Sequence, residues 1–106
     1  MRMTPLNTTF YALLDDDVLV ARCRTGDLEA FREIAIRYFQ VTYTLTCSLT
    51  GSLTRGRDLA RDTFVVAWKQ LPDLREPVRL RSWLCGIARK LIADFLRDQE
   101  RKEPVA

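Results

Sequence analysis

A tryptophan and several cations share one side of a predicted helix near the C-terminal end of the chain. At 100° per residue, the stretch "RLRSWLCGIARKLIADFLRDQERK" (79–102) places Trp83, Lys90, Arg97 and Arg101 together, away from its apolar stripe. An aromatic ring flanked by cations can stack a single-stranded base while the cations hold phosphates. Two simpler explanations stay open: the ring covers the preceding loop, or the basic face is merely solvated.

Groups that could support catalysis or metal binding are scarce. Asp58 and Asp62 lie one helical turn apart, but no nucleophile, histidine or phosphate-binding loop accompanies them, so we expect no catalytic residue and no enzyme activity. The cysteines Cys23, Cys47 and Cys85 are far apart and form no CxxC pair. We therefore expect no metal site, cofactor or disulfide, and we interpret the thiols as small buried apolar groups.

Length and charge limit the class of protein. The 106 residues, 47% of them apolar, suffice for one small domain. The net charge is +3, with −1 on residues 1–50 and +4 on residues 51–106, so an anionic partner should meet the C-terminal half. No apolar run reaches the ~20 residues of a membrane span and no signal peptide is visible, so we expect a soluble, cytoplasmic protein without a membrane partner.

Apolar periodicity and end signals predict an all-α fold, a small bundle of about four helices. The first helix begins at Asp15 or Asp16 and stops at Gly26, the second is capped by Asp27 and ends at Gly51, and two more span 53–71 and 79–102. The threonine-rich residues 41–50 are weaker as helix and leave a strand open. We expect a flexible arm over 1–14, the domain over 15–102 and a tail over 103–106.

Each of the three longer helices should carry one buried stripe. The stripes are Phe31, Ile34, Ala35, Tyr38, Leu45 and Leu49 in the first, Ala60, Phe64, Ala67, Trp68 and Leu71 in the second, and Leu84, Ile87, Ala88, Leu91, Ile92 and Phe95 in the third.

Three segments in order carry a resemblance to a known family. They are "DDDVLVARCRTGDLEAFREIAIRYF", "RDLARDTFVVAWKQL" and "RSWLCGIARKLIADFLRDQ". Together they resemble the second conserved region of extracytoplasmic-function (ECF) sigma factors over about residues 15–102. One fragment alone would be weak evidence, whereas three at the family's spacing are specific.

The resemblance implies two partners. In the family this region is a helical domain of RNA polymerase's promoter-specificity subunit, which docks on a coiled coil of the polymerase β′ clamp. It also recognises the promoter element about ten bases upstream of the start and captures a flipped-out base of the non-template strand. The implied polymerase-binding residues are Asp58, Arg61, Asp62 and Val65. The implied DNA-binding residues are Leu74, Arg75, Arg79, Arg81, Trp83, Arg89, Lys90 and Arg97.

Several positions depart from the family pattern. Arg61 stands where the family commonly has Gln, and Lys90 stands where Asn could read a base edge through a paired donor and acceptor. Leu80 and Arg81 replace aromatic residues that often precede the tryptophan, and Leu74 replaces an aromatic that can line the base pocket. Fewer stacking groups predict weaker strand opening or a different base preference.

Three interpretations therefore stay open. The first is a sigma-factor domain, either excised from a longer protein whose helix-turn-helix would follow residue 106 or a single-domain relative. The second is a degenerate sigma-like module that occupies the polymerase or another partner and acts as a negative effector without opening DNA. The third is a helical bundle with a solvated basic face. An anti-sigma factor is a further partner that the resemblance allows.

Overall fold

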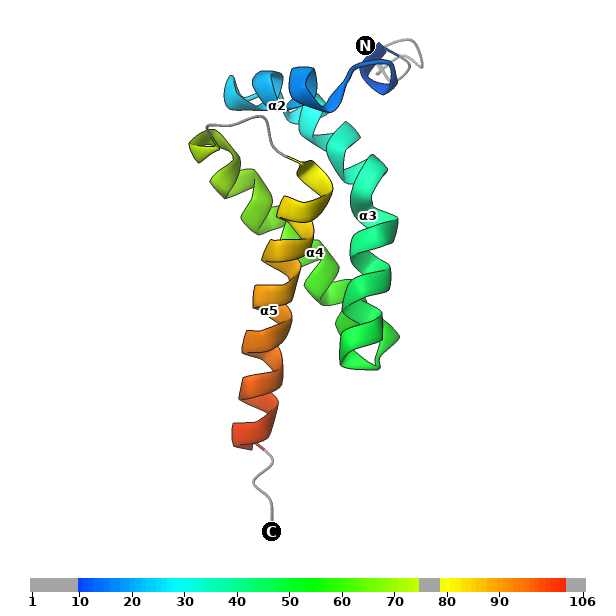
Figure 1. The fold of residues 1–106 in the computed structure, drawn as a ribbon, viewed down its shortest axis with the longest axis vertical. Coiled ribbons are helices and arrows are strands. Elements are labelled where there is room, and N and C mark those ends of the chain that lie inside the picture. The colour runs from blue at the N-terminus through cyan, green and yellow to red at the C-terminus, as the bar shows by residue number, and fades with distance from the viewer. Residues whose placement is uncertain (1–9, 75–78, 103–106) are drawn as a thin grey trace, which may run out of the picture.

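Helices build most of the part of the chain that the structure describes. This computed structural model describes residues 10–74 and 79–102 and holds α2 (Asp16–Arg24), α3 (Leu28–Thr50), α4 (Leu53–Gln70) and α5 (Leu80–Lys102). A single 3₁₀ turn, η1 (Leu71–Asp73), follows α4. No strand occurs within these ranges, so the predicted small all-α bundle is confirmed. In Figure 1, α2 lies across one end of α3, α4 and α5, and the last turns of α5 extend beyond the other helices.

The threonine-rich stretch that left a strand open is the second half of α3. Its threonine hydroxyls return to the helix's own backbone: the Thr42 hydroxyl donates to the Tyr38 carbonyl at 2.9 Å, and the Thr50 hydroxyl donates to the Thr46 carbonyl at 2.8 Å. Such bonds let threonine sit inside a helix without an unpaired polar group. Gly51 then ends α3 in the left-handed conformation, at φ 69°, as predicted.

The N-terminal end of α3 is fixed by Asp27, the predicted cap. Its Oδ1 accepts the backbone N–H groups of Glu29 at 3.1 Å and Ala30 at 3.2 Å. The Tyr11 hydroxyl donates to the other oxygen at 2.8 Å. Burial alone would raise the pKa of Asp27, but these hydrogen bonds together lower it.

Residues 10–14, which we expected in a loose arm, are held by the domain. Tyr11 and Leu14 pack against the core, and the Arg37 guanidinium donates to the carbonyls of Tyr11, Ala12 and Leu14. These contacts place the start of the folded unit before residue 15. The rest of the expected arm, residues 1–9, and the expected tail, 103–106, lie outside the described residues.

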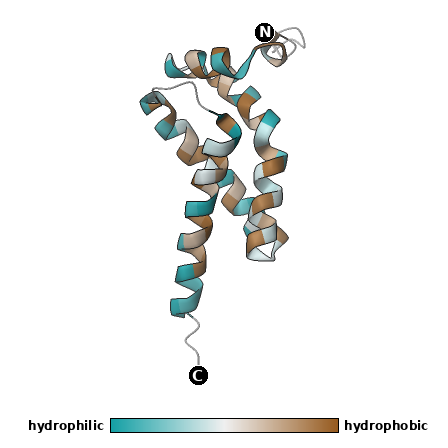
Figure 2. Ribbon diagram, in the orientation of Figure 1, coloured by the Kyte–Doolittle hydropathy of each residue, from teal (hydrophilic) through white to brown (hydrophobic). Residues whose placement is uncertain are grey.

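The core joins all four helices and η1. Its fully buried large apolar residues are Leu19, Ile34, Leu71, Leu80 and Leu84. Figure 2 shows hydrophobic bands along every helix and a hydrophilic C-terminal end of α5. The predicted stripes are confirmed in large part, but Leu49 is 48% exposed. Thr42 and Thr46 are buried on α3 instead, because their hydroxyls find acceptors there.

Helices α3 and α4 cross in close contact at Gly56. A Cβ atom at this position would lie 2.7 Å from the Cys47 Cα, nearer than real contacts allow. The Thr46 hydroxyl donates to the Gly56 carbonyl across the same crossing at 2.6 Å. Glycine is therefore required by the distance between two backbones.

Candidate nucleic-acid and polymerase surfaces

The side of α5 that faces α4 carries the tryptophan. Trp83 is half-buried and packs against the core with part of its ring, while it also lines a groove of about 530 Å³ between α4 and α5. The groove is lined by Val66, Gln70, Ser82, Trp83, Gly86, Ile87, Lys90, Leu91 and Asp94. The Trp83 side chain thus contributes to the packing of the fold and also borders an open groove.

The basic row beside Trp83 is shorter than the sequence predicts. Lys90 is exposed in the groove, whereas Arg97 forms a hydrogen-bonded ion pair with Asp94 one turn earlier. Arg101 lies 3.9 Å from Asp98. These pairs are exposed and worth only tenths of a kcal/mol, so a phosphate could compete for either guanidinium.

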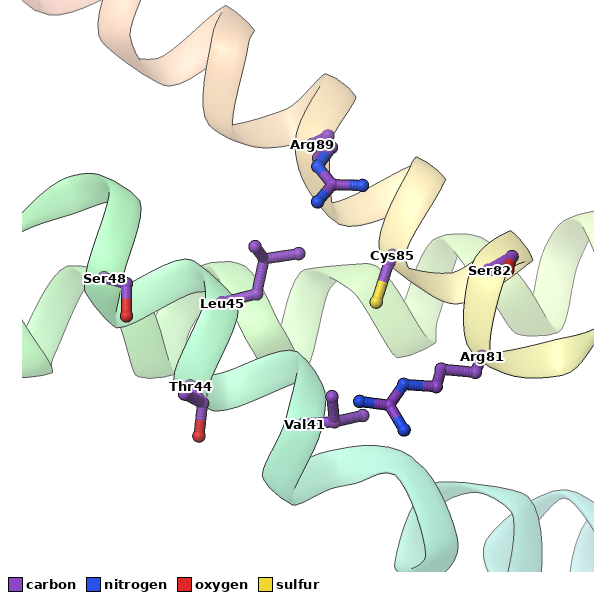
Figure 3. Close-up of a pocket in the computed structure, with 8 residues that line it drawn as sticks. All are labelled: Val41, Thr44, Leu45, Ser48, Arg81, Ser82, Cys85 and Arg89. Carbon is purple, nitrogen blue, oxygen red and sulfur yellow. The ribbon is translucent and has the colours of Figure 1, made fainter.

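Two of the other predicted DNA-binding arginines lie in a different groove. Arg81 and Arg89 line a groove of about 500 Å³ between α3 and α5, whose lining residues Figure 3 shows. Trp83 and Lys90 belong to the α4 side of the same helix. The predicted set is therefore divided between two surfaces of α5.

The remaining predicted DNA-binding residues lie before α5. Leu74 is half-buried and packs against the core, and its carbonyl accepts a hydrogen bond from the Arg24 guanidinium of α2. Arg79 is exposed, and its carbonyl accepts the backbone N–H of Trp83 at 3.0 Å. Arg75 lies outside the described residues. Sequence reasoning missed Arg24, whose tether fixes the point at which the chain leaves η1.

The predicted polymerase-binding residues share the outer face of α4. Asp58, Arg61 and Asp62 are exposed, and the Val65 side chain is 53% exposed. An apolar hollow of about 290 Å³ adjoins Val65 and is lined by Leu28, Phe31, Phe64, Val65, Trp68 and Lys69. Leu28, which sequence reasoning did not single out, is 61% exposed at its rim. Charged groups around a small apolar contact are typical of a protein interface.

A polar cluster joins α2 to α3 near the start of α5. Arg37 bonds Glu33 and Asp16, each at 2.9 Å, and the Tyr38 hydroxyl donates to Asp16. Burial, and then the hydrogen bond to Asp16, raise the pKa of Tyr38 to about 12, while the nearby Arg37 and Arg81 lower it. The cluster therefore ties α2 to α3, and the Tyr38 hydroxyl keeps its proton at neutral pH.

The thiols and carboxylates give no metal site in the described ranges. No group of three His, Cys, Asp or Glu side chains there could hold a metal ion. Cys23 is buried, and its burial raises the pKa of the thiol to about 12, so it stays protonated. Among residues 10–74 and 79–102 no helix is long and apolar enough to cross a membrane.

Comparison with known proteins identifies similar chains. The family model for sigma-70 region 2 matches residues 34–102. The ECF RNA polymerase sigma-E factors of Salmonella typhimurium and of Escherichia coli K12 are each 30% identical over 91 residues, which cover 86% of this chain and 47% of theirs. A probable RNA polymerase sigma factor, RfaY of Xanthomonas campestris, is 26% identical over 77 residues, or 73% of this chain and 19% of its own. The chain spans about half the length of the sigma-E relatives.

Proposed function

Because the chain belongs to the sigma-70 region 2 family, and specifically to its ECF type, we propose that it acts in transcription initiation. It binds RNA polymerase through the outer face of α4 and single-stranded promoter DNA through the groove between α4 and α5. The observation that carries this proposal is the groove itself, where a half-buried indole and an exposed lysine face one open volume of about 530 Å³. No catalytic step is part of the proposal.

The groove suits an unpaired base of the non-template strand in the promoter element upstream of the start. The Trp83 ring is anchored by the core on one side, so it offers a rigid stacking surface at little cost in side-chain entropy. Lys90 supplies a charge for a phosphate but no acceptor, so it adds affinity more than sequence discrimination. Arg97 can also bind a phosphate once its guanidinium releases Asp94.

The other arginines support the strand at longer range. Arg81 and Arg89 lie on the α3 side of α5, within about one Debye length of the α4 side, and raise the positive potential around the helix. Arg79 and the segment that contains Arg75 precede the groove and complete the proposed DNA-binding set. Leu74 acts there through its packing and its Arg24 tether.

Replacing Trp83 tests the stacking step. In a complex with core polymerase, Trp83→Ala should weaken binding of a labelled single-stranded promoter oligonucleotide by about 1–3 kcal/mol, because one stacked base loses its platform. Trp83→Phe, which keeps a smaller ring, should recover part of the loss. Fluorescence anisotropy measures both affinities, and thermal unfolding checks that each variant is folded. Equal affinities for the wild-type chain and Trp83→Ala would reject the stacking role.

Charge reversal on α4 tests the polymerase-binding face. The family's contact is the coiled coil of the β′ clamp, so Asp62→Arg should weaken binding to a β′ clamp fragment by about 1 kcal/mol or more. Asp98→Arg on α5 is the matched control, since Asp98 is also an exposed helical acid but lies off this face. Isothermal titration calorimetry measures the two affinities. If both variants bind like the wild-type chain, the docking face lies elsewhere.

A negative effector is the second candidate function. Leu80 stands where the family often has an aromatic, and Leu74 stands where an aromatic can line the base pocket. Leu80 belongs to the core and Leu74 packs against it, and neither lines the groove. A domain with a single stacking ring could occupy the clamp and leave DNA closed. In that case the clamp fragment would bind with dependence on Asp62, while the promoter strand would show no dependence on Trp83.

A further inference from the structure

The groove between α3 and α5 is a second concave surface, and the proposed stacking of DNA bases does not use it. It is lined by Val41, Thr44, Leu45 and Ser48 from α3 and by Arg81, Ser82, Cys85 and Arg89 from α5. Figure 3 shows Val41 and Leu45 of α3 opposite Cys85 and the two guanidiniums of α5. The volume is about 500 Å³, similar to that of the groove that holds Trp83.

Small side chains keep this groove open. Ser82 and Cys85 on α5 have short side chains, and the exposed Thr44 and Ser48 offer hydroxyls at the opposite edge. Val41, Leu45 and Cys85 form an apolar floor between them, and all three are half-buried. An apolar floor with polar edges favours an amphipathic ligand, which can bury an apolar group and keep its polar groups at the rim.

The charge of the groove has one sign. Arg81 and Arg89 are exposed and lie eight residues apart on α5, which a helical rise of 1.5 Å per residue converts to about 12 Å. No acidic residue lines the groove, and the six ion pairs found within residues 10–74 and 79–102 involve neither arginine. Two guanidiniums that form no ion pair with the described residues therefore bracket the apolar floor.

We propose that this groove docks an acidic amphipathic helix of a partner protein. Such a helix presents two carboxylates about seven residues apart, each in contact with one arginine, because two helical turns span nearly the distance between Arg81 and Arg89. Apolar residues at the third and fourth positions between the carboxylates lie on the same side of the helix and contact Val41, Leu45 and Cys85.

A nucleic-acid strand fits this groove less well. Its phosphates could contact the two arginines, but they would leave the apolar floor facing water, and no aromatic ring lines the groove to stack a base. The groove between α4 and α5 differs in both respects, because an indole lines it and its lysine is accompanied by an acidic residue. The two sides of α5 are thus suited to two different kinds of ligand.

A designed peptide tests the proposal directly. The probe is a fluorescein-labelled, alanine-rich helical peptide with two glutamates about seven residues apart and two leucines between them. We expect it to bind the whole chain by fluorescence anisotropy. We also expect it to shift the amide NMR signals of Val41, Leu45 and Cys85. A peptide with the leucines replaced by serine should bind about tenfold more weakly, because it leaves the apolar floor uncovered.

Exchange of charges separates docking from general attraction. Arg81→Glu/Arg89→Glu should weaken the glutamate peptide about tenfold, and a matched peptide with lysines in place of the glutamates should bind this variant better than it binds the wild-type chain. Both substitutions are on exposed positions, and the gain by the lysine peptide reports on a folded variant. Lys90→Gln, on the other side of α5, should leave peptide affinity within twofold.

The outcomes distinguish this proposal from the proposed function. The docking site is overturned if the glutamate peptide fails to bind, if it binds the double variant as tightly as the wild-type chain, or if its NMR shifts map to Trp83 and Lys90. It is also overturned if the double substitution lowers the affinity for a promoter oligonucleotide by a larger factor than it lowers the affinity for the peptide, since the groove would then bind nucleic acid. Loss of oligonucleotide binding in Trp83→Ala, with peptide affinity unchanged, supports both proposals separately.

Discussion

Helices α3 and α4 approach each other backbone to backbone at Gly56, whereas α5 packs on both of them through side chains and leaves an open groove beside each contact. At the first contact a single added methyl group would meet the Cys47 backbone at 2.7 Å. Beside α5 the grooves measure about 500 and 530 Å³, and a Cβ added to Gly86 would find no atom within 4 Å. The α3–α4 pair thus forms a closely packed platform, and most of the described candidate DNA-binding residues lie on α5, the helix that has room on two sides.

Adding a methyl group at the close contact should have the larger effect on stability. Gly56→Ala should lower the free energy of unfolding by about 1–3 kcal/mol, because α3 and α4 must move apart at Cys47 and disturb the Thr46–Gly56 hydrogen bond. The gain in helix propensity, up to about 1 kcal/mol, offsets only part of this cost. Chemical denaturation followed by circular dichroism measures the change.

A double variant shows whether backbone or side chain sets this limit. A Cβ added at Gly56 would meet both the Cys47 sulfur and the Cys47 backbone, so Cys47→Ala removes only one of the two obstacles. We expect Gly56→Ala/Cys47→Ala to remain less stable than Cys47→Ala alone. Equal stability of these two variants would mean that only the Cys47 thiol, and not the Cys47 backbone, leaves no room for the added methyl group. The backbones of α3 and α4 would then be farther apart than we infer.

The elements of the platform could be predicted from the sequence because their signals are local. Asp27 as a cap, Gly51 as a stop and apolar residues at three- and four-residue steps all act within one or two helical turns. The close contact itself could not be predicted in this way. Gly56 lies within α4, and no turn signal accompanies it. Glycine is needed there because Cys47, nine residues earlier and on another helix, occupies the space that a side chain would take.

The division of the candidate site between two grooves also depends on neighbours that a helical wheel does not contain. The wheel correctly placed Trp83 beside Lys90 and away from the centre of the buried stripe. It could not indicate that α4 would flank this side and α3 the other, and the resemblance that implied Arg81 and Arg89 as DNA-binding residues does not separate the two sides either. Nor could it show that Leu74 would turn inward under the Arg24 tether.

Adding a methyl group beside the groove should have the smaller effect, and with the opposite sign. Gly86→Ala should raise the free energy of unfolding by about 0.5–1 kcal/mol, because the new Cβ meets nothing and alanine restricts the unfolded chain.

Since Gly86 lines the groove next to Trp83, the same variant also probes how much room the ligand needs. A base stacked on the indole from the α4 side leaves space for one methyl group, so binding of the promoter oligonucleotide should change by less than about threefold. A large loss of oligonucleotide binding without a loss of stability would mean that the strand contacts the α5 backbone at Gly86. Both positions would then require glycine for a steric reason: Gly56 because a neighbouring helix lies against it, and Gly86 because a ligand does.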